Sequence, residues 1–202
     1  MKTKKSGFSL LEMITVLVII AIISLLLISG ANEHKKAALV AKTRTQFLQY
    51  ETAISMYCAE YGNLPTFFCD EEVLCMGEGN NSETFIKILS GRDPSGKPLS
   101  ESDKKALNPK EKTFHRFAES EFFTDDRGNR GDRKVLADAF NNKNIFVVVE
   151  DPFDDDMIIP KEKFPEAVRK YIKGDGVKNS VVIFSISDDE NMVISNCLDQ
   201  FF

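Results

Sequence analysis

The chain has 202 residues, with 26 lysines and arginines against 31 aspartates and glutamates, and a formal net charge of −5. Beyond its N-terminal segment, this length suits a single folded domain of ordinary size. An acidic balance without a basic run argues against nucleic acid as the main partner.

The N-terminus joins a short basic head to a long apolar segment. Three lysines lie within the first five residues, and the apolar stretch from Phe8 to Ala31 contains one acid, Glu12. A membrane-spanning helix needs about 20 apolar residues, whereas the core of a cleavable signal peptide has about 7–15, so the length predicts a transmembrane helix over 8–30. The alternative is a signal peptide cleaved after Ala31, which would make Asn32 the new N-terminus.

Glu12 distinguishes this segment from an ordinary membrane anchor. An acid inside a spanning helix costs about 2.5–3.5 kcal/mol on insertion scales, so it is normally retained for a function. The run Gly7-Phe8-Ser9-Leu10-Leu11-Glu12 resembles the class III signal of type IV pilins and of type II secretion pseudopilins. This resemblance implies a leader peptide over 1–7, cleavage by prepilin peptidase between Gly7 and Phe8, N-methylation of Phe8, and an assembly role for Glu12.

The chemistry of Glu12 agrees with that role. Cleavage would create a cationic amine on Phe8, and the carboxylate of one subunit could meet the amine of its neighbour inside an apolar bundle. Removing one partner of such a buried pair costs about 3–5 kcal/mol, because an unpaired charge remains. The pair would therefore fix the register between subunits.

The helix is expected to continue beyond the apolar segment, as an amphipathic helix over 31–61. This stretch contains no proline, and Val40, Phe47, Ile54 and Tyr61 recur every seven residues to form one apolar stripe. Gly62, with Pro65 shortly after it, predicts the helix end.

The remaining residues, 62–202, are expected to form a globular head. Short helices are predicted at 83–89 and 101–107, with loops around them. Two runs rich in β-branched residues, 145–149 and 181–186, predict buried strands, and 164–173 is either a surface helix or irregular. The predicted class is α+β and pilin-like, with a long N-terminal helix, half membrane-spanning and half amphipathic, packed on a small antiparallel sheet.

Two segments of the head also resemble pseudopilins. Asp138-Ala139-Phe140-Asn141 is similar to the Asp-Pro-Trp-Gly turn of major pseudopilins, with three substitutions. Ser185-Ile186-Ser187-Asp188-Asp189 is similar to their Ser-x-Gly-x-Asp loop, with Ser187 in place of the glycine.

Four cysteines, Cys58, Cys69, Cys75 and Cys197, all follow the apolar segment. Cys69 and Cys75 are close enough in sequence to close a small disulfide loop in an oxidising compartment, which leaves Cys58 and Cys197 to pair or to stay reduced. A zinc site is disfavoured, because neither pair has the two-residue spacing and no histidine is near.

The acidic side chains form two clusters late in the chain. They are Asp151, Asp154, Asp155 and Asp156 in the first, and Asp188, Asp189 and Glu190 in the second. Calcium binds six to eight oxygens, so two neighbouring acidic loops could hold it, and major pseudopilins bind calcium in a comparable loop. The alternative is a solvated acidic surface without a cofactor.

No catalytic motif is recognisable in the sequence, so an enzyme is not expected. The resemblance implies a structural subunit of a type IV pilin-like filament, most specifically a pseudopilin of a type II secretion or related system. Its partners would be other pilin-like subunits, prepilin peptidase and an inner-membrane assembly platform. It would cross the inner membrane once, with its C-terminal head in the periplasm. The alternative is an exported enzyme or binding protein tethered by an uncleaved anchor, in which Gly7 and Glu12 would have no role.

Overall fold

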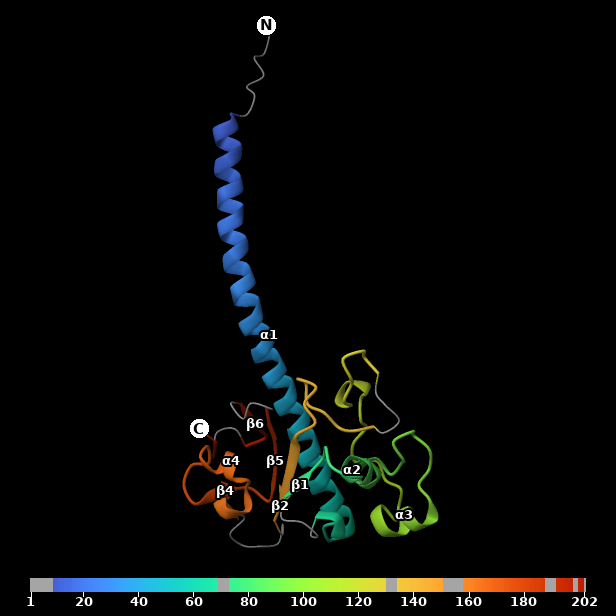
Figure 1. The fold of residues 1–202 in the computed structure, drawn as a ribbon. Coiled ribbons are helices and arrows are strands. Elements are labelled where there is room, and N and C mark those ends of the chain that lie inside the picture. Colours follow the sequence, from blue (N-terminus) through green and yellow to red (C-terminus); the bar gives the residue numbers. More distant parts are fainter. Residues whose placement is uncertain are drawn as a thin grey trace. The chain divides into compact units, whose positions relative to one another are not determined.

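The computed structural model describes residues 9–68, 73–129, 134–150, 158–187, 192–197 and 200–201, without the side chains of 25–32. The chain divides into two compact units, Met1–Leu39 and Val40–Phe202. Figure 1 shows the elements in chain order: a long helix, then short helices, then most of the strands. The α+β prediction of an N-terminal helix followed by a small antiparallel sheet is confirmed.

Helix α1 spans Leu10–Tyr61 and is continuous over 52 residues. It ends where predicted: Gly62 adopts a left-handed φ of 76°, and its N–H donates to the Cys58 carbonyl at 2.8 Å. Within the part of the chain that the structure describes, no helix combines the length and apolarity needed to cross a membrane, so the spanning helix over 8–30 is not confirmed.

The head contains a four-stranded antiparallel sheet in the order β1-β2-β5-β6. Its strands are β1 (Leu74–Cys75), β2 (Ile145–Val149), β5 (Val181–Ile186) and β6 (Val193–Ser195). The two predicted strands, β2 and β5, are confirmed with their bounds and pair along five positions. A separate two-stranded sheet pairs β3 (Ile158–Pro160) with β4 (Gly176–Lys178).

The helices of the head are short. They are α2 (Asn81–Ser90), α3 (Glu101–Leu107) and α4 (Glu166–Arg169), with 3-10 turns at Thr66–Phe68, Glu119–Glu121 and Lys161–Lys163. The helices predicted at 83–89 and 101–107 are thus confirmed. In 164–173, α4 accounts for four residues. Pro165 precedes its first residue, in agreement with the preference of proline for helix starts.

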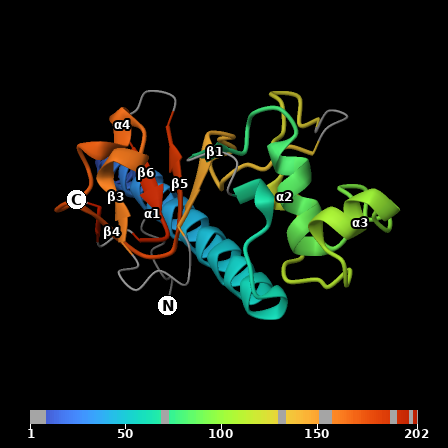
Figure 2. The ribbon, with the colours of Figure 1, turned by 90° about the horizontal axis from the view of Figure 1, so that it is seen from below.

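The four-stranded sheet is buried on both faces, and all six side chains of β5 are buried. Ile145, Val147 and Ile183 face the core shared with α1 and α2. Val148, Val182 and Phe184 face a second core, which includes side chains of β3, β4 and α4. Figure 2 shows α4, β3 and β4 on one side of the sheet and α2 and α3 on the other. Because neighbouring strand residues point to opposite faces, two strands serve both cores.

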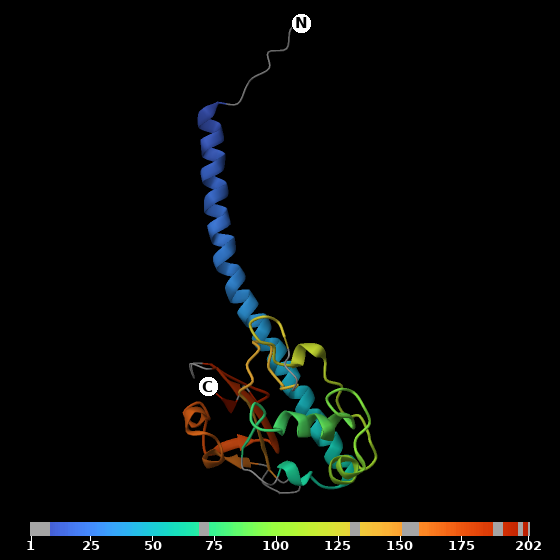
Figure 3. The same cartoon turned by 45° about the vertical axis from the view of Figure 1, so that its right-hand side comes forward.

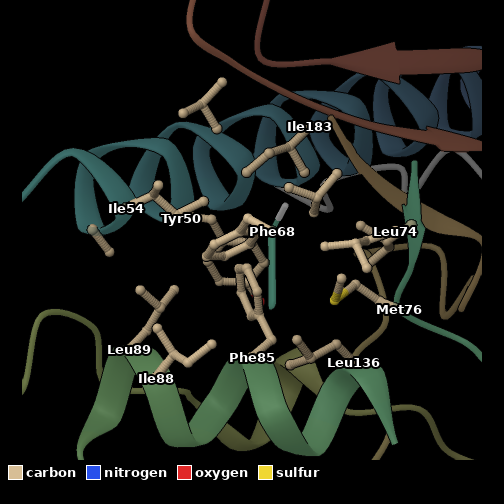
Figure 4. Close-up of a cluster of buried hydrophobic side chains, with 14 of the residues drawn as sticks. Tyr50, Ile54, Phe68, Leu74, Met76, Phe85, Ile88, Leu89, Leu136 and Ile183 are labelled. Atoms are coloured by element: carbon tan, nitrogen blue, oxygen red, sulfur yellow. The ribbon is translucent and has the colours of Figure 1, made fainter. Parts of the chain in front are cut away.

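The middle of the predicted apolar stripe of α1 lies in the first core: Phe47 and Ile54 are buried there, Tyr61 packs against it partly buried, and Val40 is partly buried outside it. Tyr50 and Tyr57, beside the stripe, are also buried there, against Phe85 and other side chains of α2. Figure 3 shows α2 beside the C-terminal part of α1, and Figure 4 shows the side chains between them. Each large apolar side chain buried in this way contributes about 1.5–3 kcal/mol, so the stripe is a main source of head stability.

Asn196 joins this helix to the edge of the sheet. Its side-chain amide donates to the Glu51 carboxylate at 2.7 Å and to the Val181 carbonyl at 3.0 Å, and its Oδ1 accepts from the Ile183 N–H at 2.9 Å. The Asn196 side chain therefore bonds to the backbone of β5 in the place where another residue of β6 would do so, because β6 ends at Ser195.

We expect Asn196→Ala to lower the free energy of unfolding by about 2–3 kcal/mol, because it leaves Ile183, Val181 and Glu51 without these partners. Asn63→Ala, an exposed position, serves as the control and should change stability by less than about 0.5 kcal/mol. Denaturant unfolding of the full-length chain measures both. Equal midpoints for the two variants would contradict the role given to Asn196.

Candidate processing and assembly site

The processing segment continues directly into the first turn of α1. Gly7 and Phe8 lie outside the described residues, of which Ser9 is the first. The Ser9 Oγ accepts from the Leu11 N–H at 3.2 Å, and the Ser9 N–H donates to Glu12 Oε2 at 2.8 Å. This reciprocal arrangement is a variant of the capping box, in which the Ser9 hydroxyl accepts from the second helical amide instead of the third.

The capping box gives Glu12 a partner within its own chain. A carboxylate in the first turn also interacts favourably with the positive end of the helix dipole. From the sequence, the only partner predicted for Glu12 was an amine of a neighbouring subunit. The missed signal was the spacing Ser-x-x-Glu directly before an apolar run, which is a recognised sequence pattern for a helix N-terminus.

The side chains that follow Glu12 are apolar around the whole helix and exposed within the single chain. Leu10 is 81% exposed and Leu17 is 64% exposed, and the other large apolar side chains as far as Ile23 are each about half exposed or more. A helix that is apolar all round is stable when other apolar groups surround it. This part of α1 therefore leaves its apolar side chains without packing partners among the described residues of the head.

Comparison with known proteins gives one result for this segment. Residues 2–28 match the family model of the prokaryotic N-terminal methylation motif. The chain carries a prepilin-type signal. This confirms the resemblance to the signal of type IV pilins and pseudopilins that Gly7 to Glu12 suggested. No curated protein and no solved structure matches the chain significantly.

The turn that begins at Asp138 connects the two pseudopilin-like segments of the head. The Asp138 carboxylate is 3% exposed and accepts from the Phe140 N–H at 2.8 Å and from the Ser185 hydroxyl at 2.8 Å. Burial raises the pKa of this carboxyl group. Asn141, at the position of the family's glycine, has a left-handed φ of 63°, which asparagine tolerates better than most residues. Asp188 and Asp189, in the second segment, lie outside the described residues.

Among the described residues of the head, the same five-residue turn occurs three times. In each copy the first aspartate accepts from the N–H groups two and four residues later, and the fourth residue is left-handed. The copies begin at Asp93, Asp125 and Asp138, with Gly96, Gly128 and Asn141 at the fourth position. The turn at Asp138 is thus a common way of reversing the chain. Aspartate at its first position favours it, because the side chain accepts backbone N–H groups of the turn.

The cysteines divide between the two cores. Cys58 is buried in the core that includes α1, and Cys197 in the core that includes α4. Cys75 is buried at the end of β1, and its predicted partner Cys69 lies outside the described residues. The Cys69–Cys75 disulfide therefore stays a prediction.

The predicted calcium ligands are Asp151, Asp154, Asp155, Asp156, Asp188 and Asp189, and all lie outside the described residues. Among the residues that are described, no group of three or more histidine, cysteine or acidic side chains is arranged to hold a metal ion. Calcium binding by the two acidic clusters stays a prediction.

We expect Ser9→Ala and Glu12→Ala each to weaken the first turn of α1 by about 1 kcal/mol, because each removes one of the two side-chain acceptors at the helix start. Amide hydrogen exchange at Ser9 and Leu11 should then rise about fivefold. Ser24→Ala is the matched control, since the Ser24 hydroxyl donates to the Ile20 carbonyl within the helix. Exchange at the first turn that is unchanged in the two cap variants would disprove the capping role.

Proposed function

We propose that this chain is a structural subunit of a type IV pilin-like filament, with the more specific role of a pseudopilin in a type II secretion or related system. The observation that carries the proposal is the N-terminal methylation motif at residues 2–28. A signal of this kind implies processing by prepilin peptidase and assembly with other pilin-like subunits.

The first turn of α1 supports this mechanism. Cleavage after Gly7 would place a new amine on Phe8, one residue before the cap residue Ser9. Glu12 already lies at this helix end, where its Oε2 accepts the Ser9 N–H. In a bundle, the amine of a neighbouring Phe8 would compete for this carboxylate. A charged pair in apolar surroundings binds more strongly than a neutral N–H donor.

The exposed apolar surface of α1 supports an assembled state. Before assembly, the inner membrane would surround this surface, with the head in the periplasm. On assembly, an ATPase-driven platform would transfer the helix into a bundle of like helices. We further propose that the subunit acts mechanically and not as an enzyme.

The N-terminus of the mature chain tests the processing step. Intact-mass and N-terminal analysis of membrane-derived protein should show a chain that begins at Phe8 and carries one added methyl group. Gly7→Val should block cleavage, because a larger side chain occupies the position before the cut. A chain that begins at Met1 would favour the tethered exported protein, and one that begins at Asn32 would exclude the filament, since Glu12 would be lost.

Filament incorporation tests the role of Glu12 separately. We expect Glu12→Val to be cleaved normally but to enter filaments poorly, because it leaves the neighbour's Phe8 amine unpaired at a cost of about 3–5 kcal/mol. Thr15→Val is the control: its hydroxyl donates to the Leu11 carbonyl of its own helix, and the substitution preserves volume. Quantitative blotting of sheared filaments compares the two. Normal incorporation of Glu12→Val would refute the charge-pair mechanism.

A further inference from the structure

A segment of the head, Thr113–Thr124, lies against α1 and α2, and we call it the strap. Backbone hydrogen bonds hold both of its ends. Near the start, the N–H groups of Phe114 and His115 donate to the Leu89 carbonyl at 2.8 and 3.0 Å. Near the end, the Phe123 N–H donates to the Val135 carbonyl at 2.8 Å. The middle of the strap is fastened mainly by side chains.

One buried carboxylate fastens the strap to α1. Glu121 is 8% exposed, and its Oε2 accepts the Tyr50 hydroxyl of α1 at 2.6 Å and lies 3.1 Å from His115 Nε2. Its Oε1 accepts the Ala118 N–H at 2.7 Å. Gln46 extends the network by donating to the Tyr50 hydroxyl and to the Ala137 carbonyl, each at 2.9 Å. Glu121 therefore links the strap to α1, and Gln46 links the same network to Ala137.

The strap covers an aromatic surface. The Phe117 ring lies 5.7 Å from Tyr50, 6.2 Å from Phe85 and 4.6 Å from His115, measured between ring centroids. Tyr50 and Phe85 belong to the core between α1 and α2. Movement of the strap would expose these rings to solvent.

The groups that face Glu121 come from two elements. From α1 the ionisable group is Tyr50, and from the strap itself it is His115. Lys134 lies next to Val135, whose carbonyl accepts from the far end of the strap. The Lys134 ammonium pairs with the Glu119 carboxylate at 3.7 Å. The Tyr50 hydroxyl and the Ala118 N–H both donate to the carboxylate, and a protonated imidazole is a third donor. An added proton on Glu121 removes the negative charge that these donors face and so weakens each of these hydrogen bonds.

We propose that Glu121 is an acid-sensitive latch, whose protonation releases the strap from α1 and exposes the aromatic surface beneath it. The step requires one proton from solvent and forms or breaks no other covalent bond. It would change which surface the head presents, independently of how the N-terminus is processed.

The pH range of release follows from the balance of effects on Glu121. Burial alone raises its pKa, but hydrogen bonds from His115, Tyr50 and the Ala118 N–H outweigh burial and hold the pKa below the ordinary value of 4.5. A lowered pKa in the folded state means that the carboxylate stabilises the fold above about pH 4.5 and that this contribution is lost as the pH falls through the lowered pKa. Burial and the charge of Glu121 raise the pKa of Tyr50, so its hydroxyl stays a donor throughout this range.

Hydrogen exchange of the full-length chain tests the proposal. Rates are measured at about pH 6.5 and at an acid pH of about 2.5, chosen well below 4.5 because the pKa of Glu121 is lowered, and are corrected for intrinsic exchange. Protection of amides 114–123 should fall at least about tenfold on acidification, while protection of β5 and of residues 85–89 in α2 persists. Unchanged protection of the strap, or an equal loss across the whole head, would overturn the latch.

Variants separate the latch from general acid sensitivity. Glu121→Gln removes the charge, so the strap should be unprotected at both pH values. Glu119→Gln is the matched control two residues away, on an exposed side chain, and should keep the native profile. If Glu121→Gln does not fold, His115→Phe decides: loss of the His115 hydrogen bond raises the pKa of Glu121 while the Tyr50 bond to α1 remains, so release should shift to higher pH. An unshifted midpoint in His115→Phe would overturn the proposal.

Discussion

The head depends on the packing of one helical stripe, Phe47 to Tyr57 of α1, against both α2 and the sheet. The stripe alone would allow some sliding, since apolar contact is not directional. Hydrogen bonds at the sides of the stripe remove that freedom. Glu51 accepts from Asn196 at the sheet edge, and the Tyr57 hydroxyl donates to the Leu107 carbonyl at the end of α3. Burial thus supplies stability, and directional polar contacts fix the register of the helix.

The elements that the sequence predicted well are those with a long local pattern. The apolar stripe and Gly62 located the end of α1, and dense β-branched residues located β2 and β5, because such strands are buried on both faces. The short strands β1, β3, β4 and β6 were not predicted. They have two or three residues each, too few to show a period, and β3 even ends in Pro160. These short strands are determined by pairing: β1 pairs with β2 about 70 residues later, β3 with β4, and β6 with β5.

The same distinction applies to the functional residues. Gly7, Phe8 and Glu12 were recognisable because a peptidase signal is contiguous in sequence. The capping box was equally local, and the pattern from Ser9 to Glu12 was open to prediction. The latch was not, because Tyr50 and Glu121 are separated by 71 positions and meet only after the head has folded. Neither residue type nor spacing marks such a pair in advance.

Glu12 shows how one side chain can serve a single chain and an assembly in turn. In the single chain its carboxylate caps the helix, a contribution of about 1 kcal/mol that favours an ordered first turn. In the proposed filament, a neighbour's amine is a stronger partner in apolar surroundings, where an unpaired charge costs about 3–5 kcal/mol. Once the helices are bundled, exchange of the cap partner for the amine is therefore favoured, because it avoids leaving a buried amine unpaired. A carboxylate held in place by the cap would also be ordered before assembly begins, so less side-chain entropy is lost when the pair forms.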